Sequence, residues 1–139
     1  MAVQAVKMSW PRSHARGQVM AQFAVSIVAL LSVTVAIADV ALWLHAQNIV
    51  IAAAQEGATV ASREGGTALA GRQAATEFLQ AGLGPSADVI QQVQVQLDAD
   101  TATVEIAGQW QVPPLGALVR VPLHARANML REAFRPGGR

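Results

Sequence analysis

The sequence predicts an α+β fold with a long N-terminal helix, a short second helix and a small three-stranded antiparallel sheet packed on the long helix. Three observations support this fold class. No glycine or proline interrupts residues 18–56, residues 67–81 repeat apolar side chains at helical spacing, and apolar and polar residues alternate from Gln92 onward. The chain has 139 residues, which is enough for one domain and not comfortably for two.

Residues 18–38 form the candidate transmembrane segment, and residues 1–17 form a basic leader before it. No charged residue lies between Arg16 and Asp39, and about 20 apolar residues suffice to cross the hydrocarbon core of a bilayer. The leader carries three basic residues and no acidic one, and the next Lys or Arg is Arg63. This asymmetry predicts a single-pass protein of the cytoplasmic (inner) membrane, with its N-terminus inside and its C-terminal part outside. The alternative is a buried helix of a soluble domain.

Residues 39–66 are expected to extend this helix beyond the membrane as an amphipathic, extracytoplasmic segment. Small apolar residues recur there at spacings of three or four, and Gly65-Gly66 supplies a stop signal. A stripe of small side chains lets another backbone approach closely, either a partner helix or a sheet. The stripe consists of Ala46, Val50, Ala53, Gly57 and Ala61.

Residues 67–130 are expected to form a small α+β domain, followed by a tail at 131–139. The domain begins with the second helix, residues 67–81, which the sequence Gly-Leu-Gly-Pro ends. Five apolar residues of this helix are able to share one broad side. They are Ala68, Leu69, Ala75, Phe78 and Leu79.

Three strands complete the expected domain. Alternation over residues 92–97 and 101–106, with a turn between them, predicts a hairpin. Gly108 is a candidate bulge or bend in the second strand. A third alternating segment, residues 119–126, contains Pro122, which indicates a strand at the edge of the sheet.

Composition and motifs argue against an enzyme. The net charge is +1 without a basic stripe, which argues against nucleic-acid binding. The chain has no cysteine, and its three histidines, His14, His45 and His124, fall in different parts of the predicted fold, so no metal site is expected. No phosphate-binding loop or Ser-His-Asp set is present in the sequence. We therefore expect no catalytic residues, no cofactor and no small-molecule substrate.

Two processing signals compete near the apolar run. The residues Ala36-Ile37-Ala38 are typical of a signal-peptidase site, whose cleavage would release a soluble chain that begins at Asp39. Alternatively, the leader ends in Arg16-Gly17, and cleavage there would leave the hydrophobic helix on the mature protein. The sequence leaves open cleavage after Gly17, cleavage after Ala38, or no cleavage.

Several short blocks follow one another in a specific order: Arg16-Gly17, then Gln22-Phe23, the apolar run, Asp39, and the segments 46–48 and 53–58. This order resembles that of the TadE-like family of minor pilins (pseudopilins) from the tight-adherence (Flp) pilus system. The resemblance implies a leader that a membrane aspartyl (prepilin) peptidase removes between Gly17 and Gln18. It also implies a subunit that assists assembly of a type IVb-like pilus or a related secretion apparatus at the cell surface. The implied partners are the membrane, other pilin-like subunits, pilus assembly proteins and the prepilin peptidase.

One residue departs from the family pattern. The family usually has Glu at the fifth mature position, where this chain has Gln22. A glutamine can hydrogen-bond but cannot neutralise a neighbour's N-terminal ammonium inside the membrane, where an unpaired charge is costly. The sequence therefore suggests a subunit at the cap or base of an assembly. The residues expected to contact partner helices are Gln22, Phe23, Asp39, Ala46, Ala53 and Gly57.

Two alternatives to a pilin-like subunit remain from sequence. One is a secreted soluble binding domain released after Ala38. The other is an uncleaved bitopic membrane protein of unrelated role.

Overall fold

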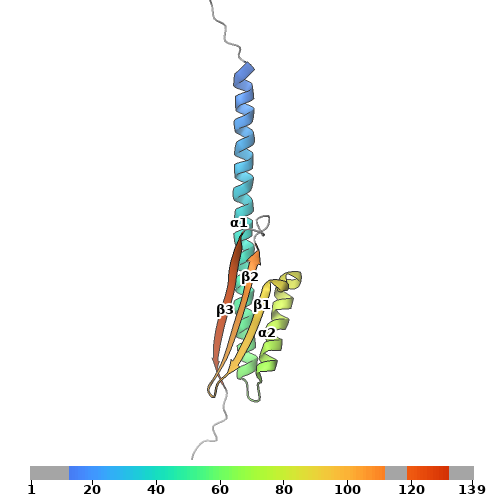
Figure 1. The fold of residues 1–139 in the computed structure, drawn as a ribbon, viewed down its shortest axis with the longest axis vertical. Helices are drawn as coiled ribbons and strands as arrows, with labels where there is room; N and C mark the ends of the chain where they lie inside the picture. Colours follow the sequence, from blue (N-terminus) through green and yellow to red (C-terminus); the bar gives the residue numbers. More distant parts are fainter. Residues whose placement is uncertain (1–12, 112–118, 132–139) are drawn as a thin grey trace, which may run out of the picture. The chain divides into compact units, whose positions relative to one another are not determined.

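The computed structural model of the chain describes residues 13–111 and 119–131, with side chains from Gly17 onward. Two helices, a short 3-10 helix and three strands follow one another, so the predicted α+β class is confirmed (Figure 1). Most of the basic leader and of the tail lies outside the described residues. In order, the elements are α1 (Ser13–Ser62), α2 (Ala68–Leu83), η1 (Gly84–Val89), β1 (Ile90–Leu97), β2 (Thr101–Gln111) and β3 (Arg120–Leu130).

The chain divides into two compact units, and α1 runs through both of them. The first unit, Met1–Ala38, is here called the anchor, and the second, Asp39–Arg139, is called the head. Helix α1 ends at Ser62, and Gly65 follows it with a φ of +75°. Only glycine adopts that backbone angle without steric cost, so the predicted stop at Gly65-Gly66 has a clear physical cause.

The core of the head forms between the α1 stripe and one face of the sheet. Along β2, buried and half-buried residues alternate, which places every second side chain against α1. The largest fully buried side chains are Val50, Val104, Ile106 and Leu123. All five members of the predicted stripe are buried, from Ala46 to Ala61.

Helix α2 packs against α1 at very close range, because two glycines face each other. A Cβ added at Gly57 would lie 2.8 Å from the Gly71 carbonyl oxygen, and one added at Gly71 would lie 2.7 Å from the Gly57 carbonyl oxygen. The buried face of α2 consists of Gly71, Ala75 and Leu79. The predicted broad apolar side is therefore partly wrong, since Leu69 is 67% exposed and Phe78 is 40% exposed. The close approach of the helices brings the small residues inward and leaves the two large ones at the surface.

The sheet has the order β1-β2-β3, and both of its ladders are antiparallel. Strand β3 lies at an edge, which confirms the position predicted from Pro122. An irregularity in register falls between Ile90 and Gln92 of β1, opposite Gly108. The bulge predicted at Gly108 therefore lies on the partner strand. Gly108 permits it, because an added Cβ would lie 2.5 Å from the Val89 carbonyl oxygen.

Candidate assembly surfaces

The anchor carries the chemistry of a membrane span. The described part of the chain has one helix long and apolar enough to cross a bilayer, and its most apolar stretch is wholly exposed. The hydroxyl groups of Ser26, Ser32 and Thr34 each donate to the carbonyl oxygen four residues earlier, at 2.8–2.9 Å. These bonds satisfy polar groups that a lipid environment could not. From Gly17 to Ala38, the part of the anchor whose side chains the structure describes, the surface can therefore face hydrocarbon without unpaired hydroxyl groups.

The predicted processing residues lie near the start of α1. Gly17 and Gln18 are both exposed, and a Cβ added at Gly17 would meet no heavy atom within 4 Å. Glycine is a weak helix former, by about 1 kcal/mol relative to alanine. A peptidase that binds an extended chain would thus have only a weak local helix to unwind.

The expected partner-contact residues do not form one surface. Gln22 and Phe23 are adjacent and exposed on the anchor, with Phe23 66% exposed, whereas Asp39 is half-buried at the first position of the head. Because the side chains of Gln22 and Phe23 are exposed, a helix of another subunit can contact both of them.

The small residues of the stripe have a different role from that expected for partner contacts. Ala46 and Ala53 are 1% and 0% exposed, and Gly57 is buried beneath α2. The sequence left open whether a helix or a sheet covers this stripe, and in this structure the chain's own α2 and sheet do so. A contact from Ala46, Ala53 or Gly57 to another subunit's helix is therefore not available in the folded head, since their surface is already used.

The outer face of the sheet carries a His–Glu contact that the sequence analysis did not find. The Nε2 atom of His124 lies 3.1 Å from Oε1 of Glu105, and the two side chains are 58% and 42% exposed. The sequence pattern did place both residues on one kind of surface, because Glu105 and His124 are polar positions of the alternating segments 101–106 and 119–126. Their pairing required the register of β2 with β3. In the two described ranges no group of three or more His, Asp or Glu side chains could hold a metal ion.

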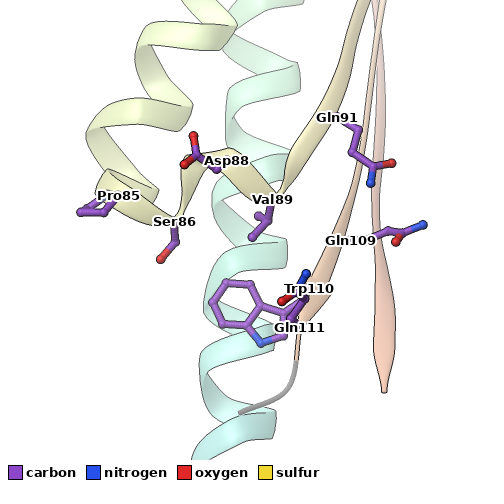
Figure 2. Close-up of a pocket in the computed structure, with 8 residues that line it drawn as sticks. All are labelled: Pro85, Ser86, Asp88, Val89, Gln91, Gln109, Trp110 and Gln111. Carbon is purple, nitrogen blue, oxygen red and sulfur yellow. The ribbon is translucent and has the colours of Figure 1, made fainter. Parts of the chain in front are cut away.

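A recess of about 390 Å³ lies between η1 and the neighbouring ends of β1 and β2 (Figure 2). Figure 2 shows the Trp110 ring and the Gln109 side chain on opposite sides of β2, as alternation along a strand requires. The recess offers one carboxylate, one hydroxyl and several amides, which can form hydrogen bonds but do not assemble a nucleophile with its base. Its lining consists of Pro85, Ser86, Asp88, Val89, Gln91, Gln109, Trp110 and Gln111.

Comparison with known families confirms the resemblance seen in the sequence. The family model described as TadE-like protein matches residues 17–59. The match begins at the predicted processing glycine and includes residues 17–38 of the anchor and most of the α1 part of the head, while α2 and the sheet lie outside it. TadE-like proteins are a structural family associated with pili, so the match suggests a protein associated with the tight-adherence pilus. Neither curated proteins nor solved structures gave a match.

Proposed function

We propose that this protein is a minor-pilin-like subunit that assists assembly of a tight-adherence pilus or a related secretion apparatus. The anchor holds it in the cytoplasmic membrane with the N-terminus inside, and the head meets assembly proteins outside. A prepilin peptidase removes the leader between Gly17 and Gln18. The role is mechanical: the protein positions partners and performs no chemistry.

The observation that carries this proposal is the TadE-like match over residues 17–59. It coincides with an exposed apolar helix that begins directly after a basic leader. The same helix continues into the head, where its stripe forms the core.

Gln22 supports a place at the cap or base of the assembly. Its side chain is exposed in the anchor and carries no charge to neutralise a neighbouring N-terminal ammonium. We expect Gln22→Glu to raise incorporation into filaments, measured by quantitative immunolabelling, whereas the uncharged variant Gln22→Ala should not. Wild-type protein distributed abundantly along filaments would contradict this placement.

The test of the proposal is the N-terminal residue and intact mass of the protein recovered from its native membrane. A start at Gln18 is expected. Gly17→Val should block processing without disturbing the fold, because nothing lies within 4 Å of a Cβ at this position. Ala21→Val is the matched control, since it adds bulk to another exposed position of the same helix but should still be processed.

One observation favours a second candidate, a soluble binding domain released by signal peptidase. The boundary between the anchor and the head falls between Ala38 and Asp39, at the alternative cleavage site. Every residue of the core cluster lies after this boundary, so release would keep the core intact. A mature N-terminus at Asp39 would establish this candidate and overturn the pilin-like one. An intact Met1 would leave an uncleaved membrane protein.

A further inference from the structure

The free edge of β1 presents backbone hydrogen-bonding groups that no strand of the sheet uses. The Asp98 N–H donates to the Thr101 carbonyl at 2.8 Å, so these two residues form a hydrogen-bonded pair. Such pairs recur at every second position of an antiparallel ladder. With the observed register, Gln92, Gln94 and Gln96 therefore bond to β2. The N–H and C=O groups of the alternate residues Val93, Val95 and Leu97 point away from β2.

The opposite edge of the sheet is protected. The Arg131 N–H donates to the Asp100 carbonyl at 2.9 Å, and the register then places the backbone groups of the even-numbered β3 residues at the outer edge. Pro122 is one of them and has no N–H to offer. The carbonyl oxygen of His124 is another, and it accepts a hydrogen bond from Nε2 of Gln47 at 2.7 Å. These are ordinary ways to block an edge strand, and they leave β1 as the more open edge.

A groove runs along the open edge between β1 and α2, which lie beside each other in Figure 1. Two recesses of about 370 and 420 Å³ form it, and they adjoin each other at Arg72 and Val93, which line both. On the β1 side they follow the strand from Ile90 to Gln96. On the α2 side, Leu69 and Thr76 lie on the same helix face as Arg72, at spacings of three and four. The groove thus combines apolar side chains and free backbone groups with one cation, Arg72, which lines both recesses, and one carboxylate, Asp88, which lines only the first of them.

The charge in the groove selects among possible occupants. Within the described ranges no carboxylate oxygen lies within 4.0 Å of the Arg72 guanidinium, since the one contact there between a basic and an acidic side chain is that of His124 with Glu105. A second copy of this chain offers no suitable edge. Its β1 has no charged residue, and its β3 carries Arg120 and Arg126, which would repel Arg72.

We propose that the β1 edge binds an extended segment of a different protein, which pairs with β1 as a fourth strand and places a carboxylate beside Arg72. The backbone groups of Val93, Val95 and Leu97 supply the main-chain hydrogen bonds. Alternate side chains of the bound strand enter the groove next to Leu69, as in other cases of strand addition to a sheet edge. The paired length after the bulge, residues 92–97, is about 20 Å at about 3.3 Å per residue. The inference rests on the geometry of the head alone and does not depend on the pilus assignment.

The test uses the full-length protein in detergent micelles and a fluorescent peptide of sequence Thr-Val-Glu-Val-Thr-Val, with a matched peptide in which Lys replaces Glu. Fluorescence anisotropy should show saturable binding of the Glu peptide and at least ten-fold weaker binding of the Lys peptide. In NMR spectra of the ¹⁵N-labelled protein, the amides of Val93, Val95 and Leu97 should shift and exchange more slowly on binding. No saturable binding at about 1 mM peptide, or shifts confined to β3, would overturn the proposal.

Arg72→Glu should weaken binding of the Glu peptide at least ten-fold and reverse the preference between the two peptides. This side chain is exposed, so the substitution leaves the core untouched. Arg120→Glu is the matched control, because it makes the same charge change at the far edge of the sheet and should leave both affinities within about two-fold. Equal losses in the two variants would show only an effect of net charge and refute a site at Arg72. Self-association through β1, detected by sedimentation and abolished by the peptide, would refute a partner of different sequence.

Discussion

Substitution of Gly57 by alanine tests the closest contact in the head. A new Cβ would lie 2.8 Å from the Gly71 carbonyl oxygen and 2.9 Å from the Ala75 Cβ. Neither atom can rotate away, so the helices must separate. Overpacking of this kind costs about 1–3 kcal/mol, and two simultaneous clashes place the cost in the upper half of that range. Alanine regains about 1 kcal/mol of helix propensity. The expected net loss of stability is therefore about 1–2 kcal/mol.

The assay is urea unfolding of the full-length protein in mild detergent, followed by tryptophan fluorescence. Trp43 and Trp110 are half-buried against the core and report its loss. With an m-value of about 2 kcal/mol/M, the unfolding midpoint should fall by about 0.5–1 M.

Gly82→Ala is the matched control. It is also a glycine in a helix, but its new Cβ would meet only side-chain atoms, of which the nearest is Cγ2 of Ile49 at 2.7 Å. We expect Gly82→Ala to cost less than Gly57→Ala, because a half-buried side chain can shift more easily than a helix backbone. If Gly57→Ala unfolds at the same midpoint as the wild type, or at a higher one, the inferred backbone contact between α1 and α2 is wrong.

Three further substitutions test separate parts of the head by the same unfolding assay. Thr67→Ala should cost about 1 kcal/mol, because the Thr67 hydroxyl caps α2 by accepting from the Ala70 N–H at 3.1 Å, while Thr67→Ser should retain most of the stability. Gln47→Ala should cost about 1 kcal/mol through loss of the bond to the His124 carbonyl, and no loss would mean that water replaces it. Ile106→Ala should cost about 2–5 kcal/mol and Ile106→Val only about 0.5–1.5 kcal/mol, since this side chain is fully buried. Equal effects of the two Ile106 changes would contradict its place in the core.

Much of the fold and part of the candidate surfaces could be predicted because their causes are local. The stop of α1 at Gly65 and the end of α2 before Pro85 depend on backbone angles set within a few residues. The apolar anchor and the TadE-like blocks are likewise properties of contiguous sequence. The edge position of Pro122 follows from its missing N–H.

Other features required contacts between residues far apart in the chain. The helical spacing of Leu69 and Phe78 is compatible with a buried face of α2, yet the glycine contact with α1 turns both outward. The bulge depends on the pairing of β1 with Gly108. In each case the sequence pattern allowed two arrangements, and the energy of packing against a distant partner selected one.

The sequence by itself therefore determined the fold class, the order of the elements, the candidate membrane segment and the family resemblance. These features arise from periodicity, turn residues and contiguous motifs. Only the tertiary structure decided that the small-residue stripe with Gly57 is covered by the chain's own α2 and sheet, and that β1 has the more open edge beside Arg72. The physical reason is that burial and strand register depend on which distant surfaces meet, and a stripe of small side chains fits a helix, a sheet or a partner equally well until one of them packs against it.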